Sequence, residues 1–147
     1  MENGWAGTRR GKPQLGQRAS RTRATSFRDV EAFTAMTGDR NPIHYDDLLA
    51  AKTVLGGLVV QGGVTTGLLN AVVAEDLPGP GTVFLETNWR FKKAVRVGQT
   101  IEARVEVVEV RDDKPICTLN TCIADSLGDT CVEGTAVTYT LPICEVR

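Results

Sequence analysis

The sequence predicts an α+β fold in which an antiparallel sheet wraps around one central, buried helix. A glycine-rich segment at 55–74 is apolar almost all round, which is typical of a buried helix. Four stretches of alternating apolar and polar residues follow it, as expected for β-strands joined by short connections. The chain has 147 residues, 41% hydrophobic and 24% charged, which fits a single domain of ordinary composition.

The elements that precede the central helix are predicted to be short. An alternating stretch from residue 17 indicates an edge strand, and Asp29 begins an amphipathic helical pattern that Gly38 is placed to end. Asn41 precedes Pro42 and is therefore disfavoured in the helical conformation, so 37–45 is predicted to be turn-like. Asp46 is suited to cap a second short helix that runs to Ala51.

The central helix is predicted to begin at 62–64 and to end near Asp76, before a Pro-Gly-Pro-Gly turn. Glycine destabilises a helix relative to alanine, so the five glycines of this segment indicate close approach of another backbone or of a ligand. Strands are predicted over 82–91, 100–110, 116–123 and 130–141. Wrapping such a sheet around the helix would bury its whole circumference, which is the hot-dog arrangement.

Charge is distributed unevenly along the chain. Residues 1–28 hold seven basic residues and one acid, whereas the remainder holds ten basic and seventeen acidic residues. We expect 1–16 to be a flexible basic tail and 17–147 to be the folded domain. An arginine-rich start can be a mitochondrial presequence, but glycines and Pro13 interrupt any amphipathic helix there. We therefore expect a cytoplasmic protein, with the mitochondrial matrix as the alternative.

Several classes of function are excluded by composition and spacing. The formal net charge of −1 argues against a nucleic-acid partner, and the absence of a long apolar run argues against a membrane partner. The four cysteines form no C-x-x-C pair and are accompanied by a single histidine, so we expect neither a metal site nor a cofactor. The cysteines are Cys117, Cys122, Cys131 and Cys144.

The densest polar cluster is the segment 38–44, which contains the only histidine of the chain. Asp39 precedes His44 by five residues within a segment stiffened by Pro42. A carboxylate and an imidazole brought together by a turn can hold a water between them and exchange protons with it. The residues alone leave a second interpretation open, in which Asp39 caps a turn and His44 is a structural histidine.

The segment 33–44 contains the pattern G-D-x-N-P-[apolar]-H and closely resembles the signature of the MaoC-like dehydratases, the (R)-specific enoyl-CoA hydratases or hydratase 2 family. The similarity extends over residues 17–142. The resemblance implies a hot-dog fold, a homodimer, and reversible hydration of trans-2-enoyl-CoA to (R)-3-hydroxyacyl-CoA. It also implies that Asp39 and His44 are the catalytic pair and that an acyl-CoA thioester is the substrate.

The resemblance further implies that the backbone N–H of Gly62, at the start of the central helix, donates a hydrogen bond to the thioester oxygen of the substrate. Helix N-termini offer free N–H groups and the positive end of the helix dipole. The family normally carries histidine before this glycine and a bulkier apolar residue after it, where this chain has Gln61 and Gly63. These two departures make Gln61 and Gly63 candidate determinants of substrate fit.

The remaining candidates each have two interpretations. Asn41 either lies near the catalytic water or holds its own loop. Lys92 and Lys93 either meet the phosphates of coenzyme A or form a solvated face. A group of apolar residues either lines an acyl tunnel or belongs to the helix core: Val59, Val60, Val64, Leu68 and Leu69.

Three other functions of the same fold are alternatives to a hydratase acting on coenzyme A thioesters. A hot-dog thioesterase places a carboxylate on or near the central helix, and 61–74 contains none. A non-catalytic acyl-binding subunit would be expected to lose the Asp39–His44 pair. An acyl-carrier-protein-linked dehydratase stays open, because the sequence does not separate the two thioester carriers.

Overall fold

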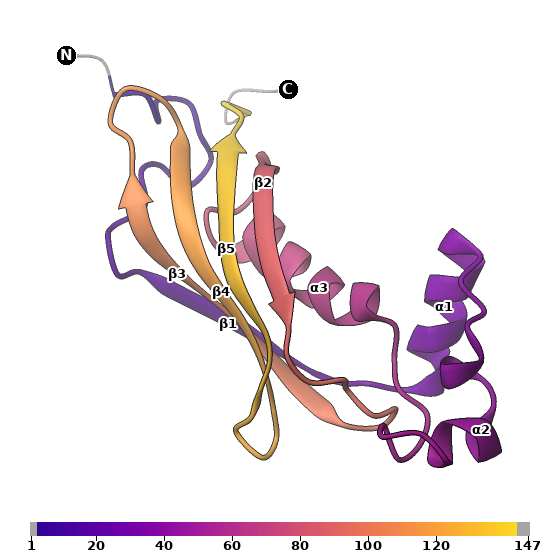
Figure 1. The fold of residues 1–147 in the computed structure, drawn as a ribbon. Helices are drawn as coiled ribbons and strands as arrows, with labels where there is room; N and C mark the ends of the chain where they lie inside the picture. Colours follow the sequence, from indigo (N-terminus) through magenta and orange to yellow (C-terminus); the bar gives the residue numbers. More distant parts are fainter. Residues whose placement is uncertain (1–2, 144–147) are drawn as a thin grey trace.

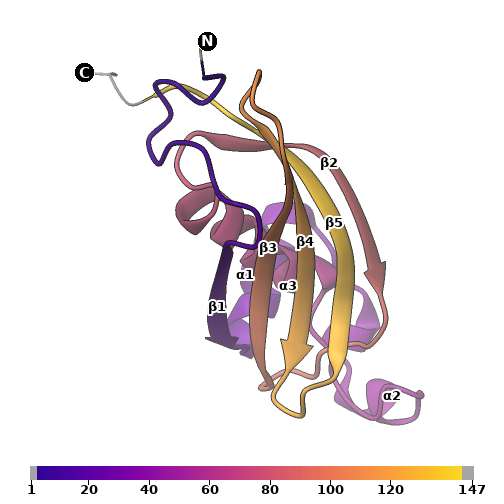
Figure 2. The same cartoon turned by 90° about the vertical axis from the view of Figure 1, so that its left-hand side faces the viewer.

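One curved antiparallel sheet covers one side of a central helix in the computed structural model, which describes residues 3–143. The strand order is β1-β3-β4-β5-β2, so β1 and β2 form the two edges (Figures 1 and 2). The predicted antiparallel pairing is confirmed, but the predicted meander holds only for β3, β4 and β5, because β2 pairs with β5 and not with its sequence neighbour β3. The strands are β1 (Arg18–Ala24), β2 (Thr82–Phe91), β3 (Thr100–Val110), β4 (Ile116–Asp125) and β5 (Thr130–Thr140).

Three α-helices lie on the concave side and at one end of the sheet (Figure 1). They are α1 (Phe27–Thr37), α2 (Asp47–Ala51) and α3 (Gly62–Ala71), with a 3-10 turn at Pro42–His44. The predicted cap of α2 is confirmed, because the Asp46 carboxylate accepts a hydrogen bond from the Leu49 N–H at 3.1 Å. A π-helical turn, η2 (Val72–Asp76), continues α3 to the predicted end of the central helix.

The core lies between α3 with η2 and the inner face of the sheet. Residues of β3 alternate between buried and accessible along the strand, as a half-buried strand requires. Leu69, Val72 and Val73 supply the helical side of the core, and all three are nearly inaccessible to solvent. The inner face of the sheet supplies Ile101, Ala103, Val105, Val107, Cys117, Leu119 and Ile123.

The central helix is buried along one side only, which corrects the expectation of burial around its whole circumference. Thr65 and Leu69 face the core, whereas Gly67 and Asn70 are exposed. A five-stranded sheet curves around part of a helix and leaves the opposite side uncovered in a single chain. This uncovered side forms a groove against α1, lined in part by Met36, Gly63 and Leu68.

The N-terminal segment packs onto the domain, so the expectation of a flexible tail does not hold for residues 3–16. Trp5 is only 1% exposed, and its indole N–H donates to the Arg111 carbonyl at 2.7 Å. The Gly4 N–H donates to the Asp112 carbonyl at 2.8 Å, and the Arg10 guanidinium donates to the Glu75 carbonyl at 3.0 Å. The large apolar surface of a buried indole provides the driving force for this packing.

No helix within residues 3–143 is long and apolar enough to cross a membrane. Over the same range, no three metal-ligating side chains come together in one group. Cys117, Cys122 and Cys131 are free thiols. Cys144 lies outside the described residues, as do residues 1–2 of the predicted tail and 144–147 of the predicted domain.

Candidate active site

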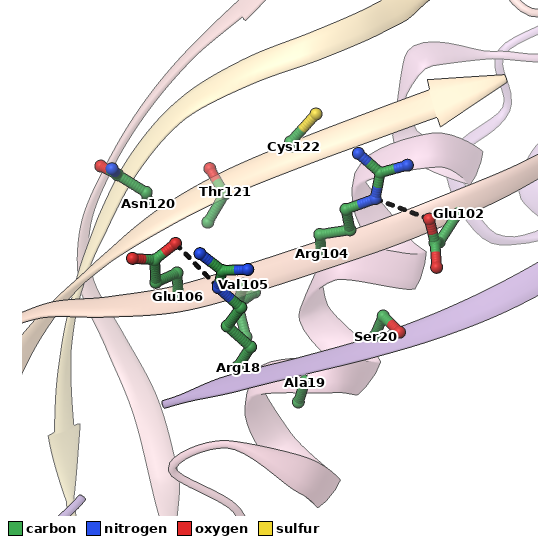
Figure 3. Close-up of a pocket in the computed structure, with 10 residues that line it drawn as sticks. All are labelled: Arg18, Ala19, Ser20, Glu102, Arg104, Val105, Glu106, Asn120, Thr121 and Cys122. Atoms are coloured by element: carbon green, nitrogen blue, oxygen red, sulfur yellow. Dashed lines mark hydrogen bonds and ion pairs between the residues drawn. The ribbon is translucent and has the colours of Figure 1, made fainter. Parts of the chain in front are cut away.

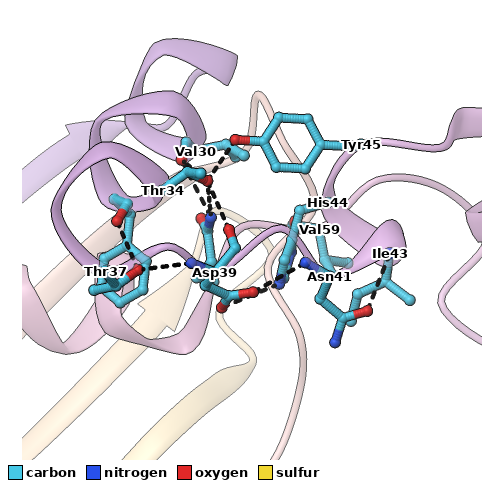
Figure 4. A network of polar contacts seen from close by, with 11 residues as sticks. Val30, Thr34, Thr37, Asp39, Asn41, Ile43, His44, Tyr45 and Val59 are labelled. Atoms are coloured by element: carbon cyan, nitrogen blue, oxygen red, sulfur yellow. Dashed lines mark hydrogen bonds and ion pairs between the residues drawn. The ribbon is translucent and has the colours of Figure 1, made fainter.

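The loop after α1 is shaped by its helix cap and by local side-chain contacts. Gly38 adopts a left-handed conformation with φ 83°, and its N–H donates to the Thr34 carbonyl at 2.7 Å. The carboxylate of Asp39 accepts from the Asn41 N–H at 3.1 Å, and the Asn41 side chain accepts from the Ile43 N–H at 3.4 Å (Figure 4). Of the two interpretations of Asn41, these contacts support the loop-holding one.

The loop brings Asp39 and His44 together. The Nε2 atom of His44 lies 3.9 Å from Oδ2 of Asp39 (Figure 4). The His44 side chain is buried and the Asp39 side chain is 38% exposed, so the carboxylate is the member of the pair that reaches solvent. A separation of 3.9 Å is too long for a direct hydrogen bond and leaves room for a water that contacts both groups.

The orientation of the His44 ring follows from its other nitrogen. Nδ1 lies 2.6 Å from the Val59 carbonyl oxygen, which can only accept, so Nδ1 carries the proton. In the neutral ring, Nε2 is then the unprotonated nitrogen, and it faces Asp39. The Val59 carbonyl is itself held in place, because the neighbouring Val60 N–H donates to Val95 and the Val97 N–H donates to Leu58.

A cavity of about 420 Å³ joins His44 to the beginning of α3. Its lining includes His44, Gly62, Thr65, Phe91 and Val132. Gly62 is the first residue of α3 and is exposed, and the first N–H groups of a helix have no intrahelical partner. The cavity therefore combines an imidazole, free backbone donors and apolar walls.

Close aromatic contacts explain why two glycines stand at the start of α3. A Cβ atom on Gly62 would lie 2.9 Å from the Phe91 ring, and one on Gly63 would overlap the Phe33 ring. The close approach at these two glycines is made by side-chain rings from β2 and α1, and not by another backbone or a ligand as predicted. Gly63 does not line the cavity with His44; it lines the groove between α1 and α3.

Gln61 lies behind the site and does not line the cavity. It is 1% exposed, and its Nε2 lies 3.1 Å from the Val30 carbonyl and 3.3 Å from the Thr34 hydroxyl. The Thr34 hydroxyl also contacts the Asp39 carbonyl at 2.7 Å and the Tyr45 hydroxyl (Figure 4). The Gln61 amide thus connects the start of α3 to α1 and to the loop that carries Asp39.

Thr34 and Tyr45 also belong to this network, although the sequence pattern did not single them out. The available signal was the position of Thr34, which falls one helical turn after Val30 on the buried side of α1. A hydroxyl on a buried stripe requires a partner, and here it has several.

Lys92 and Lys93 line the cavity, but both are engaged by carboxylates. Lys93 Nζ lies 2.8 Å from Asp125 and 2.7 Å from Asp129, and these two neighbours raise the pKa of the Lys93 ammonium. The hydrogen bond from Lys93 is the main cause of the lowered pKa of Asp125. Lys92 lies 3.1 Å from Glu133 on the half-exposed rim.

A second hollow lies on the outer face of the sheet, away from every predicted site residue. It is lined by residues of β1, β3 and β4, including Cys122 (Figure 3). Its charged side chains pair with one another: Arg18 lies 3.2 Å from Glu106, and Arg104 lies 2.6 Å from Glu102. None of the predicted catalytic or substrate-binding residues lines this hollow.

Together, the fold and the cavity define the class of protein. An unprotonated Nε2, a carboxylate oxygen 3.9 Å from it, and free helix N–H groups suit the addition of water next to a carbonyl, or its removal. This is the chemistry of a hydro-lyase on a hot-dog fold.

Comparison with known proteins identifies the family. Residues 10–125 match the MaoC like domain, and the chain belongs to this family. It is 37% identical over 124 residues to the (R)-specific enoyl-CoA hydratase of Aeromonas caviae, covering 84% of this chain and 92% of the relative. It is 44% identical over 85 residues to the 3-hydroxybutyryl-CoA dehydratase of Methylorubrum extorquens, covering 58% of this chain and 54% of the relative.

Solved structures agree with this assignment. The (R)-hydratase of A. caviae superimposes with a TM-score of 0.84 at 36% identity, over 88% of this chain and 98% of that one. An R-hydratase from Pseudomonas aeruginosa superimposes with a TM-score of 0.81 at 33% identity, over 87% of this chain and 82% of that one. The predicted hot-dog fold and the family resemblance are confirmed.

Proposed function

We propose that this chain hydrates trans-2-enoyl-CoA to (R)-3-hydroxyacyl-CoA and catalyses the reverse dehydration. The observation that carries the proposal is the Asp39–His44 pair, with an unprotonated Nε2 3.9 Å from the carboxylate. The names of the relatives support a coenzyme A thioester as the substrate and a hydro-lyase as the class of enzyme.

The pair activates water in the forward direction. The thioester carbonyl makes C3 of the enoyl chain electrophilic, and the water oxygen bonds to C3 while the pair takes up one water proton. The C2–C3 π electrons move toward the carbonyl, and the pair returns one proton to C2. The protonation of Asp39 and His44 is therefore unchanged over one turnover, and both new bonds form on the face of the substrate that meets the pair.

Gly62 stabilises the charge that develops on the thioester oxygen. Its exposed N–H at the start of α3 has no helical partner and lies in the same cavity as His44. A preorganised donor of this kind contributes about 3–4 kcal/mol in acyl-transfer enzymes. The helix dipole adds to this stabilisation, because its positive end faces the same oxygen.

The other predicted residues serve the site in different ways. Asn41 and Gln61 position the loop of Asp39, and Gly63 allows the Phe33 ring to pack against α3. Lys92 is the better candidate for a contact with coenzyme A phosphate, since its carboxylate partner Glu133 is half-exposed. Lys93 is held between two carboxylates and shapes the rim of the cavity.

A homodimer is proposed from the free sheet edge. The outermost strand β2 exposes Val83, Leu85 and Phe91, and an unpaired edge with apolar side chains favours pairing with a second copy. Light scattering of the purified chain is expected to give twice the monomer mass. A monomeric mass across the working concentration range would contradict this part of the proposal.

The proposed activity is tested with crotonyl-CoA, by following loss of the enoyl-thioester absorbance and analysing the chirality of the product. We expect (R)-3-hydroxybutyryl-CoA. Release of free coenzyme A thiol without hydration would instead identify a thioesterase. Parallel reactions with the same acyl group on acyl carrier protein would distinguish the two carriers, with the coenzyme A substrate expected to react faster.

A further inference from the structure

The lining of the proposed active-site cavity has an exposed charged part and a buried apolar part. The side chains of Lys92 and Lys93 reach solvent. Val132 and Val95 are nearly inaccessible, and Thr65 of α3, also buried, belongs to the same lining. Polyanionic coenzyme A is strongly hydrated and stays at the solvent-exposed part, so the apolar part of the acyl chain is directed towards the buried end at Val132.

The next row of the sheet beyond Val132 is defined by strand register. Phe91 of β2 pairs with Val132 of β5, and two residues further in, Trp89 pairs with Gly134. Because side chains alternate, Trp89 faces the same side of the sheet as Phe91, which contacts Gly62 of α3. Gly134 places no side chain in this row, so the Trp89 ring is the bulky group there.

The Trp89 ring is fixed in place against its neighbours. It meets Phe84 edge to face, with ring centroids 5.9 Å apart and an angle of 88° between the rings. The ring packs against the hydrophobic core, and its Nε1 is buried without a hydrogen-bond partner among the described residues. Displacing the indole would disturb the core, so a ligand meets a rigid wall.

We infer that Trp89 closes the acyl end of the cavity and restricts the enzyme to short acyl chains. This inference rests on the proposed function. Rows on one face of a strand are about 7 Å apart, a distance that roughly five carbon–carbon bonds span. With the thioester oxygen at Gly62, beside Phe91, an acyl chain of roughly six carbons reaches the Trp89 row.

The test is a chain-length profile of kcat/KM for trans-2-enoyl-CoA substrates from four to ten carbons. The wild-type enzyme is expected to lose activity beyond six carbons. Trp89→Leu is expected to raise the ratio of eight-carbon to four-carbon activity by about tenfold or more, because it removes a ring from the path of the chain. Trp89→Phe keeps a ring in place and is expected to change this ratio much less.

Asn88→Ala provides the matched control, since Asn88 is exposed on the opposite face of the same strand. It is expected to leave the profile unchanged. A wild-type enzyme that hydrates ten-carbon and four-carbon substrates equally well would overturn the inference. An unchanged profile in a folded Trp89→Leu protein would do the same.

Two further outcomes separate this inference from the proposed function. If the wild-type chain hydrates no enoyl-CoA, the proposed function itself fails. If Trp89→Leu does not fold, binding of saturated acyl-CoA to the wild-type protein gives the answer without a variant. Butyryl-CoA is expected to bind at least tenfold more tightly than decanoyl-CoA, and equal affinities would contradict a wall at Trp89.

Discussion

The two ends of the central helix are built in opposite ways. At the start of α3, Gly62 is exposed and the helix opens onto the cavity of the proposed active site. At the far end, Val72, Val73 and Leu77 are buried together with Trp5 from the N-terminal segment. One helix therefore combines two tasks: its open end borders the proposed active site, and its sealed end contributes to the hydrophobic core.

Removing either side chain of the proposed catalytic pair beside the open end is expected to have the largest effect. His44→Ala and Asp39→Asn should each lower kcat for crotonyl-CoA hydration by about 10²–10⁴-fold, the range of general acid–base catalysis. Asp39→Asn should change the midpoint of thermal unfolding little, because its amide oxygen can still accept from the Asn41 N–H; His44→Ala removes a buried ring bonded to Val59, so its kcat is compared on the folded fraction. Near-normal turnover in either variant would refute the assignment of the pair.

Disrupting the core packing at the far end of α3 is expected to lower the free energy of unfolding without changing kcat. Trp5→Ala should lower the free energy of unfolding by about 3–5 kcal/mol, the typical cost of removing a buried aromatic ring, as measured by urea denaturation. The kcat of the folded fraction should stay at the wild-type value. Trp5→Phe is the matched control and should cost much less, and an equal cost in both variants would argue against ring burial as the cause.

A change at Gln61 tests whether the contacts of its amide with α1 position the loop that carries Asp39. Gln61→Leu removes the amide contacts to Val30 and Thr34 and is expected to lower kcat by roughly ten- to a hundredfold through misplacement of the Asp39 loop. The KM should change less, because Gln61 does not line the cavity. Gln61→His keeps a side-chain N–H donor and should retain most of the wild-type activity, whereas a rise in KM alone would indicate direct substrate contact.

The smallest expected effect concerns the ion pair at the rim. The pKa of Asp125 is lowered in the folded protein and that of Lys93 is raised. Stability from the Asp125 carboxylate is therefore present above about pH 4 and lost as the pH falls through its lowered pKa. Stability from Lys93 is present below about pH 10 and lost only above that range.

Urea unfolding at pH 7 and at progressively lower pH measures this contribution. Asp125→Asn should flatten the loss of stability on acidification relative to the wild-type protein. Asp112→Asn is a suitable control, because Asp112 is an exposed acid whose partner is Lys12. Equal acid sensitivity in the wild-type protein and both variants would show that the rim pair contributes nothing measurable.

Local patterns predicted the elements well because their causes are local. The bounds of β2 and β3, the cap of α2 and the start of α3 depend on alternation, capping and glycine placement within a few residues. Helix α1 begins earlier than its apolar stripe suggested, since Asp29 is not its first residue but accepts from the Ser26 N–H in its first turn.

Long-range packing accounts for what the sequence did not predict. Trp5 finds its partner Arg111 more than a hundred residues away, and nothing near Trp5 signals that contact. The carboxylate partners of Lys92 and Lys93 come from β5 and from the β4–β5 hairpin, so only the sheet register brings them to the rim. The Asp39–His44 pair could be predicted because a single loop carries both side chains.

The single histidine of the chain makes the site directly observable by spectroscopy. The ring protons of His44 give the only histidine signals in an NMR spectrum of the protein. The anchored Nδ1–H, held by the Val59 carbonyl, should exchange slowly with solvent, while Nε2 faces Asp39 and should respond to ligands in the cavity. Protonation, tautomer and substrate approach can therefore be followed at one imidazole without labelling or mutating any other residue.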